Sequence, residues 1–180
     1  KELLECCLIS QDKIVPFDPL ITYQAQELYV PKPIYCGNPS KEDIQLIRDY
    51  LHIKDIRTEK PIGIIIKRPK NRPRSMINFD YIASMISHKD KNRKWHVFEH
   101  LSIKASIQLF QKADIVIAPH GAGLANMIFC ARDTHIVEYV IEEEPNLCYW
   151  HLSELLGHHY YCIPVQYKGL QKSFMAPFDF

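Results

Sequence analysis

Long apolar runs, metal-ligand spacings and glycine are scarce in this sequence. No apolar stretch approaches the ~20 residues that cross a bilayer, and the opening KELLECCLIS does not have the pattern of a secretory signal peptide. The six cysteines include no Cys-x-x-Cys pair and no spacing typical of zinc ligands. We therefore expect no membrane span, signal peptide or zinc site within these 180 residues.

The sequence also has no large excess of positive or negative charge. The formal net charge is +1, which excludes the general positive field behind non-specific nucleic-acid binding, so we expect no nucleic-acid partner. Positive charge is concentrated locally in KRPKNRPR, residues 67–74. The composition, 47% hydrophobic and 24% charged, is typical of one globular domain or lobe. Half of the cysteines lie in apolar runs, which favours buried free thiols over disulfides.

From residue 62 onward, short β-branched runs alternate with segments of helical periodicity. The runs predict strands over residues 62–67, 95–99, 115–119, 135–141 and 160–165. The periodic segments predict helices over residues 78–88, 102–113, 124–130 and 147–156, with Asn78 as an N-cap. This order predicts an α/β fold, a Rossmann-like parallel sheet covered by helices, over residues 61–180.

The first 60 residues do not follow this alternation. We expect a strand near Ile14, extended chain over the proline-rich residues 30–39, and a helix over residues 41–52 opened by a capping box of Ser40 and Asp43. We interpret residues 1–60 as a linker and a partial amino-terminal flank of the sheet. Because the sequence begins without Met, we expect a fragment or a processed chain.

The segment IVIAPHGAGLANMIF, residues 115–129, predicts a buried strand, a tight turn and a helix start. Ligands of open α/β sheets bind at the carboxyl ends of the strands. Gly121 and Gly123 predict positive φ and a close backbone approach, and the N–H groups of residues 123–125 would point at an anion. A diphosphate fits this turn, with His120 as a further donor. Alternatively, the glycines only close the turn and His120 caps a backbone carbonyl.

Charged residues follow other strands of the same predicted sheet. Glu138 closes the next strand, where a carboxylate can bind ribose hydroxyls; alternatively it is an edge charge or an ion-pair partner of Arg132. Arg68 and Arg74 follow the first strand, and guanidinium groups suit phosphate oxygens. The alternative for these arginines is a solvated basic loop.

Three rival chemistries fit the same residues less well. A dinucleotide fingerprint, GxGxxG/A, would have Gly or Ala where Asn126 stands and would lie on the first βαβ unit. An α/β-hydrolase needs a GxSxG nucleophile elbow, which the sequence lacks. A metal at His120 has no partners, since His158 and His159 are adjacent and would point apart on a strand, and no Asp-x-Asp pair is present.

Two further groups are predicted to be structural. The aromatic residues near the carboxyl end could stack an acceptor, but helical and strand spacing favours packing; they are Tyr149, Trp150, Tyr160 and Tyr161. The acidic run at residues 142–144 is predicted to be a solvated loop.

Several segments together resemble a known family. They are RPKNRPRSMIN, SIKASIQLFQKA, DIVIAPHGAGLANMIF, HIVEYV and CYWHLSELLGHHYY, and they are similar to glycosyltransferase family 61, also called DUF563. The resemblance covers roughly residues 60–165, and PHGAGLxN followed by VxE is its specific part. The family includes N-acetylglucosaminyl-, xylosyl- and arabinosyltransferases.

This resemblance implies the carboxy-terminal lobe of an inverting GT-B glycosyltransferase that works without a metal or other cofactor. The donor would be a UDP-sugar, either UDP-N-acetylglucosamine or a UDP-pentose, and the acceptor a hydroxyl of a protein or polysaccharide. Family members work in the secretory pathway. The resemblance therefore implies the lumen of the endoplasmic reticulum or Golgi, with any membrane anchor outside this chain.

The resemblance also implies a nucleotide-sugar site, made of Arg68, Arg74, His120, Gly121, Ala122, Gly123, Leu124, Asn126 and Glu138. The arginines would contact the diphosphate or the base, residues 121–123 the phosphates, and Glu138 the ribose. Asn126 would brace the turn. The general base is not assigned, with His120 as the one candidate.

The sequence departs from the family pattern at two places. It has Ala105 and Ser106 where the family has Glu-Gln, and Phe79 where Glu is common. The alternative function is therefore a non-catalytic sugar-nucleotide or glycan-binding module of the same fold. An α/β-hydrolase is a distant third.

Overall fold

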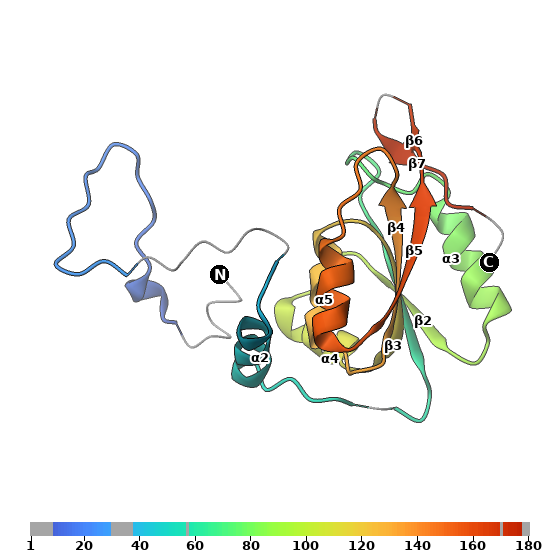
Figure 1. Ribbon diagram of the computed structural model, residues 1–180, viewed down its shortest axis with the longest axis horizontal. Coiled ribbons are helices and arrows are strands. Elements are labelled where there is room, and N and C mark those ends of the chain that lie inside the picture. Colours follow the sequence, from blue (N-terminus) through green and yellow to red (C-terminus); the bar gives the residue numbers. More distant parts are fainter. Residues whose placement is uncertain (1–8, 30–37, 57, 170, 178–180) are drawn as a thin grey trace.

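The computed structural model describes residues 9–29, 38–56, 58–169 and 171–177. Its centre is a five-stranded sheet with helices on both faces (Figure 1). The strands are β1 (Ile62–Ile66), β2 (Lys94–Phe98), β3 (Ala113–Pro119), β4 (His135–Ile141) and β5 (His159–Val165). Their order is β2-β1-β3-β4-β5 and every pair is parallel, which confirms the predicted α/β fold.

The helices cover the sheet because its side chains alternate between two apolar faces. They are α2 (Lys41–Tyr50), α3 (Phe79–Lys89), α4 (Ile103–Phe110), the 3₁₀ helix η2 (Ala122–Phe129) and α5 (Cys148–Leu156). Ile64 and Ile66 lie in the core under α4, η2 and α5, whereas Ile65 packs in the core under α3. Figure 1 shows α3 on the opposite side of the sheet from α4 and α5.

The strand order places a topological switch between β1 and β3. The chain leaves β1 toward α3 on one face and leaves the adjacent β3 toward η2 on the other. A crevice forms at the carboxyl ends of two strands whose connections part in this way, and ligands of doubly wound sheets bind there. The topology therefore indicates that the functional site lies at the carboxyl ends of β1 and β3.

Two predicted local elements differ from the structure. The segment predicted as an α-helix over residues 124–130 is the 3₁₀ helix η2, because its hydrogen bonds span three residues: the Leu124 N–H donates to the Gly121 carbonyl at 2.9 Å. The strand predicted near Ile14 is wrong: residues 9–29 contain only a 3₁₀ turn, η1 (Gln11–Lys13). Pro16 and Pro19 follow at once and remove strand-pairing donors.

The amino-terminal region has one part that packs on the sheet and one that does not. The predicted capping box of α2 is confirmed, since the Ser40 Oγ accepts from the Asp43 N–H at 3.1 Å and Asp43 bonds back to the Ser40 N–H. Ile44 is buried against the body. Residues 9–29, blue in Figure 1, extend away from it. Of the proline-rich residues 30–39, residues 30–37 lie outside the described part of the chain.

A carboxy-terminal hairpin, which the sequence analysis does not predict, holds the loop after β1. It consists of β6 (Tyr167–Lys168) and β7 (Ser173–Phe174). Phe174 is fully buried in the α3-side core, and its N–H donates to the Ser75 carbonyl at 3.1 Å. The Arg74 N–H donates to the Lys172 carbonyl at 2.7 Å. The hairpin therefore fixes the backbone of the arginine-rich loop.

Asn78 contributes to the same attachment. It stands at the N-cap of α3, as predicted, but its side chain makes no capping hydrogen bond. Instead, its Nδ2 donates to the Ala176 carbonyl at 2.9 Å and its Oδ1 accepts from the Ala176 N–H at 3.0 Å. The side chain thus ties the start of α3 to the carboxy-terminal segment.

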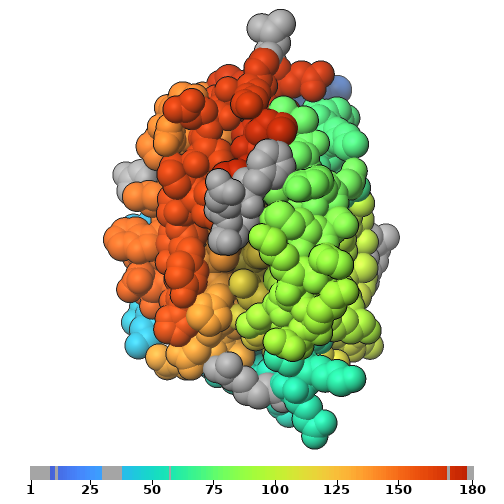
Figure 2. Space-filling view, turned by 90° about the vertical axis from the view of Figure 1, so that its right-hand side faces the viewer, coloured from blue at the N-terminus to red at the C-terminus, as the bar shows by residue number. Residues whose placement is uncertain are grey.

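The described part of the chain contains three cysteines. The described cysteines are free: Cys130 is buried, as predicted, Cys148 is half-buried and Cys162 is exposed. On the α3 side, shown in Figure 2, an apolar pocket of about 260 Å³ lies between α3 and the sheet, lined in part by Trp95 and Val137. In the part of the chain that the structure describes, no helix has the length and apolarity needed to span a membrane.

Candidate nucleotide-binding site

The ends of β1 and β3 bring three of the predicted site residues together. Arg68 follows β1, and its Nη1 lies 3.5 Å from the carbonyl oxygen of His120, which follows β3. The Arg68 Nε donates to the Pro73 carbonyl at 2.7 Å, which fixes the side chain. A β-carbon on Gly121 would collide with the Arg68 guanidinium. Glycine is therefore required at position 121 for Arg68 to lie over the turn.

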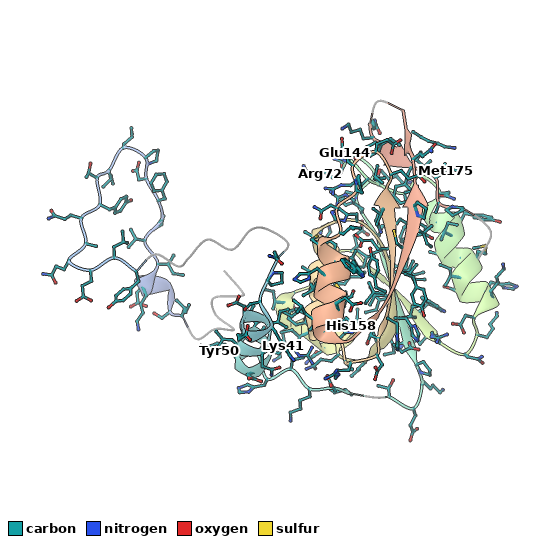
Figure 3. The ribbon with its side chains drawn as sticks, viewed as in Figure 1. Lys41, Tyr50, Arg72, Glu144, His158 and Met175 are labelled. Carbon is teal, nitrogen blue, oxygen red and sulfur yellow. The ribbon has the colours of Figure 1, made fainter. Side chains whose placement is uncertain are left out.

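The loop after β1 carries three guanidinium groups close to one another. Burial and then the charges of Arg74 and Arg72 lower the pKa of Arg68, partly offset by Tyr149. Among the described residues, no ion pair includes any of these arginines. Three neighbouring cations, none of them in an ion pair among the described residues, favour the binding of a polyvalent anion. Figure 3 shows Arg72 at the end of the sheet toward which the strands point.

His120 lies just behind this loop and is 7% exposed. Its Nδ1 is 2.6 Å from the Oε1 of Glu138, and its ring lies 5.2 Å from the ring of Tyr149, centroid to centroid. Because a carboxylate only accepts hydrogen bonds, the Nδ1 carries the hydrogen. His120 therefore does not cap a backbone carbonyl with its side chain, which was the structural alternative.

Glu138 is fully buried. Its second oxygen, Oε2, accepts a hydrogen bond from the Tyr160 hydroxyl at 2.6 Å. The two alternatives for Glu138, an edge charge and an ion pair with Arg132, are wrong, since the Arg132 guanidinium lies beside Gly157 at the opposite edge of the sheet. Ribose binding by Glu138 stays a prediction; both carboxylate oxygens already have partners.

The turn after His120 differs in detail from its prediction. Of the two glycines, only Gly121 has positive φ, at 159° with ψ 173°, a conformation that essentially only glycine adopts. Gly123 is needed for space instead, because a β-carbon there would lie 2.9 Å from Ile66 Cγ2. Leu124 does not face the crevice: its N–H is bonded to the Gly121 carbonyl and its side chain is buried. The predicted bracing by Asn126 is confirmed, since its Nδ2 donates to the Gly123 carbonyl at 2.9 Å.

A pocket of about 410 Å³ opens beside the turn, within the range of small-molecule sites. Arg68, Arg72 and residues 121–123 form one side, so the exposed Ala122 lies where it was predicted. Phe98, Glu99 and His100, at the end of β2, form another side. These three residues were not predicted as site residues, because only the strand order places β2 next to β1.

Tyr149 and Tyr160 pack against the hydrophobic core, as predicted, and the structure also places them in contact with His120 and Glu138. Tyr149, in the first turn of α5, is half-buried against the His120 ring. Tyr160 lies on the same sheet face as Glu138, a relation that the period-2 spacing on β5 allows but that needs the strand register to identify. The other two aromatic residues, Trp150 and Tyr161, are about half exposed rather than packed.

The acidic run at residues 142–144 is exposed, as predicted, but it is not merely solvated. Glu144 pairs with the Lys172 Nζ at 2.6 Å and accepts from the Tyr167 hydroxyl at 3.0 Å. The run therefore anchors the carboxy-terminal hairpin near the arginine-rich loop. The positions that depart from the family pattern are not in the crevice: Ser106 and Phe79 are buried and Ala105 is half-buried.

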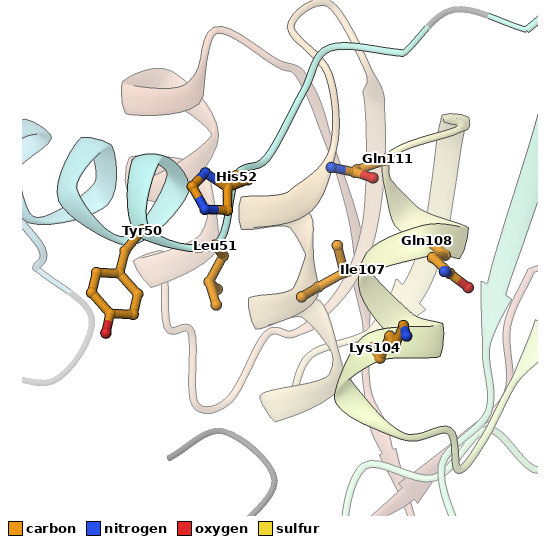
Figure 4. A pocket seen from close by; sticks show the side chains of 7 residues that line it. All are labelled: Tyr50, Leu51, His52, Lys104, Ile107, Gln108 and Gln111. Atoms are coloured by element: carbon orange, nitrogen blue, oxygen red, sulfur yellow. The ribbon is translucent and has the colours of Figure 1, made fainter. Parts of the chain in front are cut away.

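Two other groups lie away from this edge. His158 is buried and His159 is exposed, which confirms that their side chains point apart, and among the described residues no cluster of three His, Cys, Asp or Glu side chains is arranged for a metal ion. A pocket of about 320 Å³ lies between α2 and α4, with Tyr50, His52 and Lys104 on its walls (Figure 4). It lacks the glycine turn and the arginine cluster.

Comparison with known proteins gives two matches. A family profile described as Glycosyltransferase 61 matches residues 3–137. The EGF domain-specific O-linked N-acetylglucosamine transferase of Drosophila melanogaster is 27% identical over 147 residues, which are 79% of this chain. The chain spans 28% of the length of that relative. The profile match begins and ends earlier than the resemblance expected over residues 60–165, and it stops one residue before Glu138.

Proposed function

The chain belongs to glycosyltransferase family 61, and we propose that it is the nucleotide-sugar-binding lobe of an enzyme that transfers a sugar to a protein or glycan hydroxyl. One observation carries this proposal. Two guanidinium groups, those of Arg68 and Arg72, line a pocket with a glycine turn at the switch point of a doubly wound sheet, and the charge of Arg74 acts on Arg68 from nearby. A nucleoside diphosphate supplies the anion that such a crevice favours.

The donor that we propose is a UDP-sugar. The matched relative is named as an O-linked N-acetylglucosamine transferase, which supports UDP-N-acetylglucosamine as the first donor to test and a protein hydroxyl as the acceptor. A UDP-pentose is the second donor to test. We further propose a GT-B arrangement, in which another lobe supplies the acceptor side, and a location in the secretory pathway.

The proposed reaction is an inverting displacement at the anomeric carbon. The acceptor oxygen forms a bond to that carbon, the bond to the diphosphate oxygen breaks, and the acceptor proton passes to a general base. Negative charge develops on the diphosphate as it leaves. We propose that Arg68 and Arg72, which line the pocket, stabilise this charge together with the nearby Arg74 and His120, so that no metal ion is needed.

The test is a calorimetric titration with UDP in EDTA, with NAD as a comparison ligand. Arg68→Gln and Arg74→Gln should each weaken UDP binding by roughly 10- to 100-fold, the usual worth of a charge-assisted hydrogen bond. Arg132→Gln is the matched control, because this exposed arginine lies at the opposite edge of the sheet. Its affinity should match that of the unsubstituted chain.

Two results would contradict the proposal. One is a folded chain that does not bind UDP; the other is preferential binding of NAD. Equal losses in all three arginine variants would point to a general effect of charge. If UDP binds but no sugar is transferred by the complete protein, the alternative function, a non-catalytic binding module of the same fold, takes its place.

A further inference from the structure

The carboxyl end of β2 forms part of the pocket beside the glycine turn. Glu99 and His100 line this pocket of about 410 Å³ together with Arg68, Arg72 and residues 121–123. In the strand order, β1 separates β2 from β3, so the ends of β2 and β3 lie about 10 Å apart. A nucleotide whose phosphates bind at the glycine turn and the arginines can therefore reach the end of β2 with its nucleoside.

The backbone at the end of β2 is held on both sides. The Phe98 carbonyl accepts a hydrogen bond from the Lys67 N–H at 2.8 Å, and the Phe98 ring packs edge-on against the Phe110 ring, with centroids 5.0 Å apart. Helix α4 begins a few residues later, with Ser102 as its N-cap. Residues 99–101 are therefore a short connection between two fixed elements, and the side chains that leave it start from a defined backbone.

Glu99 is a carboxylate that the protein leaves available to a ligand. It is exposed, it is the one acidic residue among the described residues that line the pocket, and no ion pair among the described residues includes it. Two other carboxylates near this end of the sheet are engaged. Asp80 lies 3.7 Å from the Lys67 Nζ and 3.8 Å from the Lys70 Nζ, and both oxygens of Glu138 have partners within the protein.

The chemistry of a carboxylate limits what Glu99 contacts. A carboxylate only accepts hydrogen bonds, so the group that it binds must donate them. The phosphates of a nucleotide are acceptors and carry the same sign of charge, so Glu99 repels them. The ribose next to the diphosphate carries two vicinal hydroxyls, and the two oxygens of one carboxylate can accept hydrogen bonds from both.

We propose that Glu99 accepts hydrogen bonds from the ribose hydroxyls of the sugar nucleotide, so that the nucleoside lies over the end of β2. This inference rests on the proposed function, and it moves the ribose contact from the buried Glu138 to Glu99. The nucleoside stays bound throughout the transfer, so it can occupy a pocket. The transferred sugar needs open space opposite the diphosphate, where the acceptor oxygen approaches, and it lies outside the pocket.

Two effects of opposite sign follow from this placement. The Glu99 charge weakens the binding of any ligand that contains phosphate, while its hydrogen bonds strengthen the binding of ligands that contain ribose. Replacement by glutamine keeps the shape of the side chain and removes the charge. The variant therefore separates a ribose contact from a carboxylate that is only nearby, because a nearby charge would affect every phosphate ligand in the same direction.

The test is calorimetric titration of the full chain in EDTA with UDP, 2′,3′-dideoxy-UDP and pyrophosphate. Glu99→Gln should bind UDP roughly tenfold more weakly, because it loses charge-assisted hydrogen bonds to the ribose. Pyrophosphate, which has no ribose, should bind the variant at least as tightly as the unsubstituted chain. The unsubstituted chain should bind dideoxy-UDP roughly tenfold more weakly than UDP, and Glu99→Gln should not weaken that binding further.

A control variant makes the same change away from the pocket. Glu154→Gln lies at an exposed position near the end of α5 and should bind every one of these ligands like the unsubstituted chain. Urea unfolding checks that both variants are folded. Because Glu99 is exposed, Glu99→Gln should unfold at the same urea concentration as the unsubstituted chain.

Several results would overturn the inference and leave the proposed function in place. One is tighter binding of UDP by Glu99→Gln; another is an equal loss with UDP and with dideoxy-UDP. If Glu99→Gln binds UDP normally but UDP-N-acetylglucosamine more weakly, the carboxylate contacts the transferred sugar and the inference is wrong. A folded chain that does not bind UDP removes the proposed function and this inference together.

Discussion

The guanidinium of Arg68 lies over Gly121, in the volume that a β-carbon at that position would fill. Arg68 leaves β1 and Gly121 follows β3, so this contact joins the two strands at the switch point of the sheet. Gly121 has φ 159° and ψ 173°, so the backbone conformation and the lack of space for a β-carbon both make glycine necessary here. The glycine turn and the arginine-rich loop are thus in direct contact.

Gly121→Ala should weaken UDP binding about as much as Arg68→Gln does, by roughly tenfold or more, because the methyl group displaces the guanidinium from the turn. The fold should also lose about 1–3 kcal/mol of stability, because alanine is strained at the backbone conformation of Gly121. Calorimetry with UDP and urea unfolding measure the two effects.

Gly169→Ala is the matched control for that substitution. Gly169 has φ +68° and no atom within 4 Å of the added carbon. The alanine is therefore strained but meets nothing, and it should cost about 1 kcal/mol of stability. UDP affinity should stay unchanged. If both variants lose affinity alike, the special contact between Gly121 and Arg68 is not what holds the ligand.

Asn78→Ala should destabilise the chain by about 1–3 kcal/mol and also weaken UDP binding. The substitution removes both hydrogen bonds to the Ala176 backbone, which attach the carboxy-terminal segment to the start of α3. That segment follows β7, which holds the backbone of the arginine-rich loop through Ser75. The measurements are urea unfolding and calorimetry. Alanine at the exposed Asn92 is the control, and an unchanged affinity in Asn78→Ala would show that the loop does not depend on this attachment.

Gly63→Ala should destabilise the sheet by about 1–3 kcal/mol without changing UDP affinity. A β-carbon on Gly63 would collide with the Trp95 indole of the neighbouring strand. Trp95→Leu in the same chain should recover part of the loss, because the smaller side chain leaves room for the methyl group. Urea unfolding of both single variants and the double variant gives their coupling. Additive losses would mean that the two residues do not compete for space.

Much of the sheet could be predicted because its three central strands, β1, β3 and β4, are mostly buried on both faces. Parallel strands under helices read as continuous β-branched runs, and β4 is predicted with its observed bounds, His135–Ile141. The position of the crevice could be predicted in the same way, because the carboxyl ends of parallel strands lie at the same end of the sheet. This is why Arg68 was expected at the same site as His120 and Gly121, which are about 50 residues further along the chain.

The relations that the sequence could not predict depend on register or on distant contacts. Tyr160 donates to Glu138 only because β4 and β5 pair in one particular register. The β6–β7 hairpin is too short to give a periodic signal, and its contact with Ser75 joins residues far apart in the chain. Whether a turn continues as an α-helix or as the 3₁₀ helix η2 depends on packing against the sheet rather than on local spacing.

The stability of the fold should fall with acid because of His158, which is buried below η2 and α5. Its Nε2–H donates to the Met127 carbonyl at 3.2 Å, while its Nδ1 is buried without a partner. Burial lowers the pKa of His158 from 6.5 to about 4. The folded chain therefore binds fewer protons than the unfolded chain between these two values, and stability is present above about pH 6.5 and is lost as the pH falls toward 4.

His158→Gln should remove much of this dependence on pH. The shift corresponds to roughly 3 kcal/mol between neutral pH and about pH 4, so urea unfolding between about pH 4.5 and pH 7.5 should show a clearly shallower slope in the variant than in the unsubstituted chain. His88→Gln, at an exposed position on α3, should keep the original slope. If His158→Gln keeps that slope as well, the buried imidazole takes its proton without unfolding the chain, and the acid sensitivity belongs to other groups.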